Sequence, residues 1–191
     1  MLDASASVNE PDGYNTNGRP SGVDWLPSVM RTIEQTITQV GSLEPVFFEC
    51  IGTEVVMHSI PPDKYDFNNS GDKRRLAADL KVHVARSKPD AHALCCEAWM
   101  AKFPLTGMTE EEREAKLEWI NEHGVSALPD HEKQETIIVF LTINKPDKER
   151  WMVYIPVTRV QRTGTVVCDV EGTTWSKMTP PYDTSGTFSD L

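Results

Sequence analysis

The sequence predicts an α+β domain, with a mostly antiparallel sheet of about five strands and two long helices on one face. Helical and extended patterns occur along the chain in the order α-β-α-β-α-β-β-β. The last three strands follow one another through short turns, which favours antiparallel hairpins. The length of 191 residues suits one domain with short tails.

The first helix is expected to begin at Asp24, a favourable N-cap, with Pro27 in its first turn. Its apolar side chains recur every three or four residues until Gly41, a C-terminal signal. The next segment reads VFFECI at residues 46–51, which predicts a strand. A bend or turn at Gly52 and Thr53 leads to a further extended segment at residues 54–60.

A second helix is predicted over residues 72–87, and the apolar segment at residues 92–100 predicts another strand. Thr109 followed by Glu112 forms the pattern of a capping box, in which side chain and backbone satisfy each other's hydrogen bonds. It opens a short acidic helix that ends at Gly124.

The last third of the chain predicts strands at residues 135–143, 150–157 and 165–170. The apolar strands do not alternate cleanly with polar residues, so both faces of the sheet need cover. The first two helices are expected on one face. The short third helix, the tails or a second subunit would cover the other, and a homodimer is therefore expected.

Both ends of the chain are polar and rich in small residues. Residues 1–22 are interpreted as a flexible N-terminal arm and residues 171–191 as a C-terminal tail, since neither can bury enough apolar surface to offset its ordering entropy. The single domain is then residues 23–170.

Charge and hydropathy exclude several classes of protein. The net charge of −10 and the pI of about 4.9 disfavour nucleic acid and anionic membrane surfaces as partners. The sequence contains no apolar stretch long enough to span a membrane and no export signal, which favours the cytoplasm and reduced thiols.

Metal-ligand and nucleophile motifs are missing from the sequence. The five histidines and four cysteines show no CxxC, HExxH or HxH spacing, so no metal or cofactor is predicted. Cys95 and Cys96 lie in an apolar strand, which raises a thiol pKa and argues against a reactive thiolate. We therefore assign no catalytic residue. The histidines are His58, His83, His92, His123 and His131.

Two carboxylates inside apolar strands are the candidate ligand or partner residues. Glu49 lies between Phe48 and Cys50, and Glu97 shares a strand face with Trp99. A carboxylate in such a place needs a partner or a wet cleft. One interpretation is a pocket with Glu97 as acid, base or anchor and Trp99 as its wall. The other, which we favour, is an internal ion pair, for example with Lys81 or Arg159.

Three segments resemble an uncharacterised family of small bacterial and phage α+β proteins. They are the strand start EPVFF at residues 44–48, the strand end EAWM at residues 97–100, and the extended HEKQET at residues 131–136. The likeness covers roughly residues 25–160, and the acidic segment at 104–124 and the tails depart from it. The resemblance implies an α+β fold and carries no known activity.

Two functional hypotheses follow. The first, which we favour, is a non-enzymatic interaction or regulatory protein that binds a protein partner or itself. Missing catalytic motifs and two-sided apolar strands support it. The second is a small enzyme or small-molecule binder that uses a cleft at Glu97 and Trp99.

Overall fold

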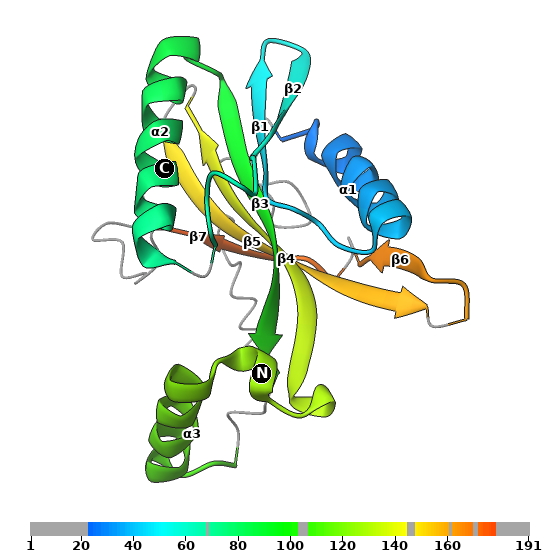
Figure 1. Cartoon of the computed structure of the whole chain (residues 1–191), viewed down its shortest axis with the longest axis vertical. Helices are drawn as coiled ribbons and strands as arrows, with labels where there is room; N and C mark the ends of the chain where they lie inside the picture. Colours follow the sequence, from blue (N-terminus) through cyan, green and yellow to red (C-terminus); the bar gives the residue numbers. More distant parts are fainter. Residues whose placement is uncertain are drawn as a thin grey trace, which may run out of the picture.

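The computed structural model describes residues 23–67, 69–102, 107–144, 148–160, 162–169 and 172–178. In these ranges the chain forms three α-helices and a seven-stranded sheet in which every strand pair is antiparallel (Figure 1). The α+β class is therefore confirmed. The elements are α1 Leu26–Val40, β1 Val46–Ile51, β2 Glu54–Ser59, α2 Ser70–Ser87, β3 Ala91–Ala101, α3 Glu110–His123, β4 Lys133–Ile143, β5 Glu149–Val160, β6 Thr165–Cys168 and β7 Thr174–Lys177.

The strand order in the sheet is β2-β1-β3-β4-β5-β6, and β7 also pairs with β5. β6 pairs with residues 157–160 of β5 and β7 with residues 151–154, so the two short strands follow one another along one edge of β5. The long strands β3, β4 and β5 form the centre (Figure 1).

The expected count of about five strands was too low, for two reasons. The segment at residues 46–60 is not one bent strand but a hairpin, because Gly52 has φ 61° and reverses the chain between β1 and β2. β7, inside the segment interpreted as a C-terminal tail, adds the other strand. The resulting order is α-β-β-α-β-α-β-β-β-β.

The two long helices lie on opposite faces of the sheet, which corrects the prediction that they share one face. Phe48 packs in the larger core with the apolar stripe of α1. Its neighbour Phe47 packs in a second core with Leu76 and Leu80 of α2. Adjacent strand residues point to opposite faces, so each helix covers one face and the two-sided apolar strands are explained.

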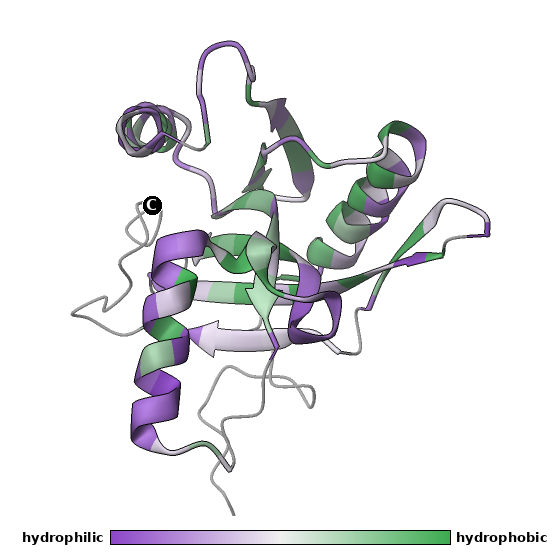
Figure 2. Cartoon of the chain, turned by 60° about the horizontal axis from the view of Figure 1, so that its bottom comes forward, coloured by the Kyte–Doolittle hydropathy of each residue, from purple (hydrophilic) through white to green (hydrophobic). Residues whose placement is uncertain are grey.

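The helix boundaries follow local chemistry. α1 begins one residue later than predicted, with Trp25 rather than Asp24 at the N-cap, and ends at Gly41, whose φ of 91° suits glycine. Its hydrophobic side is turned toward the sheet (Figure 2). α2 is capped by Asn69, whose side chain accepts from Gly71 and Asp72. α3 has the predicted capping box.

α3 does not cover the sheet. None of its residues is buried, and it lies beyond the ends of β3 and β4 (Figure 1). Two short 3₁₀ helices, Val125–Ala127 and Asp130–Glu132, connect it to β4. Among the helices of the described ranges, none has both the length and the apolar content that a membrane crossing needs.

Candidate functional site

Three elements bring one carboxylate and two imidazoles together. Glu49 lies on the α2 face of β1, two residues after Phe47. The hairpin register places His58 of β2 directly opposite Phe47, and therefore diagonal to Glu49. On α2, His83 and Ser87 extend the buried stripe of Leu76 and Leu80 at helical spacing, so both are directed at the same part of the sheet.

The geometry centres on a single oxygen. The Nε2 atoms of His58 and His83 lie 2.9 and 2.8 Å from Oε2 of Glu49. The other oxygen, Oε1, accepts a 2.5 Å hydrogen bond from the hydroxyl of Ser87. The Glu49 side chain is 3% exposed, whereas those of His58 and His83 are 37% and 43% exposed. The carboxylate of the cluster is thus buried, whereas its two imidazoles are partly exposed to solvent.

Glu49 is held in its ionised form. Burial by itself would raise the pKa of this carboxyl, but the hydrogen bonds from Ser87 and His83, the charge of His83 and the hydrogen bond from His58 outweigh it and lower the pKa. Because an ionised carboxylate only accepts hydrogen bonds, each Nε2 atom carries a proton in this arrangement. The ligand atoms of the three residues lie within 4.8 Å of one another, so the three residues could hold one metal ion.

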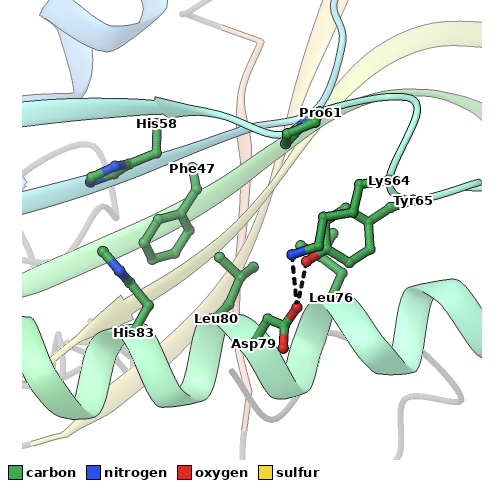
Figure 3. Close-up of a pocket in the computed structure, with 9 residues that line it drawn as sticks. All are labelled: Phe47, His58, Pro61, Lys64, Tyr65, Leu76, Asp79, Leu80 and His83. Carbon is green, nitrogen blue, oxygen red and sulfur yellow. Dashed lines mark hydrogen bonds and ion pairs between the residues drawn. The ribbon is translucent and has the colours of Figure 1, made fainter.

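The histidines form one end of a pocket between the β1–β2 hairpin and α2 (Figure 3). Its volume is about 250 Å³. His58 and His83 face each other from the strand and the helix, and their ring centroids are 4.9 Å apart. The remaining lining residues are mostly apolar: Phe47, Pro61, Lys64, Tyr65, Leu76, Asp79 and Leu80.

The other end of the pocket is polar. Asp79 accepts a 2.5 Å hydrogen bond from the hydroxyl of Tyr65 and lies 3.3 Å from Nζ of Lys64 (Figure 3). The hydrogen bonds from Tyr65 and Lys64 lower the pKa of Asp79. The pocket therefore offers apolar walls between a histidine end and a fixed ion pair.

Glu97, predicted as either a pocket residue or half of an ion pair, contacts Arg159. Its Oε1 is 3.0 Å from Nη2 of Arg159, and its Oε2 accepts a 2.7 Å hydrogen bond from the backbone of Leu43. Arg159 also binds Glu135. Burial, together with the neighbouring carboxylate of Glu135, raises the pKa of Glu97. Both of its oxygens thus have structural partners.

Trp99 is 44% exposed, and Nζ of Lys133 lies 5.2 Å from its ring centroid. Glu97 and Trp99 are on the α1 face of β3, so the structure does not bring them together with Glu49, which faces α2. Neither lines the pocket beside the histidines. Their role in binding a ligand or partner stays a prediction.

The cysteines have the character that the sequence predicts. Cys50, Cys95 and Cys168 are buried, and all four cysteines are free. Burial raises the pKa of Cys96 and of Cys168 to about 12, and it also raises that of Cys95 well above its usual value. These thiols are poor candidates for nucleophiles.

Sequence analysis identified Glu49 but missed its two histidines. They lie on different elements from Glu49, 9 and 34 residues away, so no local spacing connects them. One signal was present: His83 and Ser87 occupy inward positions of a helix whose other inward residues are apolar. A polar pair at such positions indicates a polar partner on the sheet.

Comparisons with known proteins add no constraint, since no family model, no curated protein and no solved structure matches this chain. The resemblance to small bacterial and phage proteins therefore stays a prediction, and any functional argument depends on the geometry described above.

Proposed function

We propose that the protein binds a divalent transition metal, with Zn²⁺ the best match, through Glu49, His58 and His83. The observation that carries the proposal is the convergence of both imidazole Nε2 atoms on one buried carboxylate oxygen. Two imidazoles and one carboxylate are a common ligand set for catalytic zinc and also serve iron(II).

The positions of the ligand atoms are close to what a metal requires. A tetrahedral zinc ion with ligand distances of about 2.0–2.1 Å keeps its ligand atoms about 3.3 Å apart. The present distances of 2.9 and 2.8 Å between nitrogen and oxygen need to lengthen by about 0.5 Å to admit it. Both histidines are partly exposed, so they can make this movement at little cost. In the metal-bound form each imidazole carries its proton on Nδ1 instead.

The surroundings of Glu49 support a metal site further. Ser87 donates a hydrogen bond to Oε1 and leaves Oε2 for the metal, and a hydrogen bond of this kind orients a ligating carboxylate. A metal held by these three residues would leave room for a further ligand from the pocket side. It would lower the pKa of a bound water to about 7 and could polarise a carbonyl or phosphoryl group. The apolar walls suit a small substrate with an apolar group, so metal-assisted hydrolysis is the chemistry that we propose.

The test is metal titration of the full chain. After treatment with a chelator, the protein should bind one Zn²⁺ per chain by calorimetry. Replacing a ligand, as in His83→Gln or His58→Gln, should weaken binding more than about 100-fold, because losing a residue that only hydrogen-bonds to a ligand already costs about 10–100-fold. Ser87→Ala removes the hydrogen bond to Oε1 of Glu49 and should weaken zinc binding by that smaller factor, about 10–100-fold.

His131→Gln is the matched control, because the His131 side chain is 81% exposed and lies outside the cluster. It should bind zinc as the unchanged protein does. Equal zinc binding by the unchanged protein and a His58→Gln, His83→Gln double variant would overturn the proposal. Iron(II) binding in preference to zinc would keep the site and change the metal.

The interaction-protein hypothesis has its own support. β2 is a sheet edge with three apolar side chains, Val55, Val56 and Met57, that are 38%, 39% and 50% exposed. Edge strands of this kind favour pairing with another chain. The two hypotheses are compatible, although His58 belongs both to the edge strand and to the pocket.

A further inference from the structure

β2 is an unprotected edge strand. Among the strands of the described ranges, β1 is its one neighbour. Its sequence, EVVMHS, has no lysine or proline, the residues that natural proteins commonly use to blunt an edge. Its apolar side chains are exposed on both faces, as noted above.

The register of the hairpin decides which backbone groups of β2 face outward. The carbonyl of Cys50 accepts from the amide of Asp90, beside β3, so the backbone groups of Cys50 point away from β2. The groups of Glu49 and Ile51 therefore point toward β2 and bond to Val56 and Glu54. By the same alternation, Val55, Met57 and Ser59 direct their N–H and C=O groups to the free edge.

We propose that β2 pairs with the β2 strand of a second copy of this chain, antiparallel and about a twofold axis at Val56. In this register Val55 forms hydrogen bonds with the partner's Met57, and Val56 packs against the partner's Val56. Each of the exposed apolar side chains on the strand then has an apolar neighbour across the interface.

Charge complementarity selects this register over the next one. With the axis at Val56, Glu54 lies opposite the partner's His58, which is an acid–base pair. With the axis at Met57, Val55 would lie opposite the partner's Ser59 and Val56 opposite the partner's His58. That register leaves Glu54 without a cross-strand partner and mixes apolar with polar side chains. A second copy is thus a better complement than an arbitrary extended segment.

The twofold axis runs perpendicular to the sheet, so α2 of both copies lies on the same face. α2 packs over Phe47 and Leu94, inside the edge strand, which leaves room between the two helices. The pairing also brings the partner's Glu54 beside His58, on the face that carries Glu49. This last consequence rests on the proposed metal centre, whereas the pairing itself does not.

Cysteine cross-linking of the full chain tests both the pairing and its register. Directly opposed residues of a non-hydrogen-bonded pair have Cα atoms about 4.5 Å apart, within the range that a disulfide spans. Val56→Cys should therefore form a covalent dimer under mild oxidation, and Met57→Cys should form much less. The unchanged protein is the control for its four native cysteines.

Light scattering provides the second measurement. The unchanged chain should show a mass above its own 21.4 kDa at tens of micromolar, while Val56→Lys, which places two like charges at the axis, should be a monomer. The variant should still melt cooperatively, at a temperature that no longer depends on protein concentration. A monomer at all concentrations together with no cross-linking of Val56→Cys would overturn the proposal. Faster cross-linking of Met57→Cys would overturn the register. A dimer that persists after a chelator is added would show that the pairing does not depend on the proposed metal site.

Discussion

The guanidinium of Arg159, on β5, lies against both carboxylate oxygens of Glu135 on β4, with its Nε 2.9 and 2.8 Å from them. Glu135 is 8% exposed. The same guanidinium donates a 2.6 Å hydrogen bond to the carbonyl of Gly41, at the end of α1. Arg159 therefore connects the C-terminus of α1 to β4 and β5.

Replacing Arg159 with methionine should destabilise the fold by about 2–3 kcal/mol, because Glu135 would be a buried carboxylate without its cation. The value is below that of fully buried pairs because Arg159 is partly exposed. Chemical denaturation measures the change. Arg162→Met, at an exposed turn position, should stay within about 0.5 kcal/mol. Equal effects of the two variants would contradict the structural role of Arg159.

Glu135 and Glu97 share Arg159, but neutralising them should lower the free energy of unfolding by different amounts. Burial would raise the pKa of Glu135, but its hydrogen bonds with Arg159 lower it, so its charge contributes stability that is lost as the pH falls through the folded-state pKa. The pKa of Glu97 is raised, so its ionised form contributes less. Glu135→Gln should therefore cost about 2 kcal/mol and Glu97→Gln less than about 1 kcal/mol at neutral pH. The reverse order, measured by urea unfolding, would show that Glu97 is the main partner of Arg159.

His92 should make stability fall at mildly acidic pH. It is 1% exposed, and burial, followed by the charge of Lys148, lowers its pKa from 6.5 to about 4 despite the opposing charge of Glu49. The unfolded chain thus binds a proton between these pH values that the folded chain does not, so stability is full above about pH 6.5 and declines toward pH 4. The loss should reach about 3 kcal/mol.

The measurement is the free energy of unfolding from pH 4 to pH 8. His92→Gln removes the titrating group and should flatten the profile, while His131→Gln, at an exposed site, should leave it unchanged. A profile of the same slope in His92→Gln would assign the acid sensitivity to other groups.

Part of the predicted C-terminal tail should be needed for stability. Trp175 of β7 packs against the larger core, and its ring lies 6.4 Å from that of Trp151. A chain ending at residue 171 should lose about 2–3 kcal/mol of aromatic burial and melt about 5–10 °C lower than one ending at residue 178. Trp175→Ala in the full chain should reproduce most of the loss. Identical melting of the two truncated chains would instead support a dispensable tail. Residues 1–22 lie outside the described residues, and their interpretation as a flexible arm stays a prediction.

Local patterns predicted the elements well. The helix caps at Gly41 and Thr109 and the strand at residues 46–51 are confirmed where the sequence predicts them. The pattern at Gly52 and Thr53 left a bend and a turn open, because glycine permits both, and the positive φ of Gly52 belongs to the tight reversal of a hairpin.

By itself, the sequence determined where helices and strands form, because side-chain periodicity, caps and turn residues act within a few residues of each other. It also determined that both sheet faces would be buried and that Glu49 would need a polar partner. Only the tertiary structure decided that α1 and α2 take opposite faces, and that His58 and His83 meet at Glu49. Those relationships depend on strand register and on which way the chain crosses the sheet, and no short-range pattern encodes either choice.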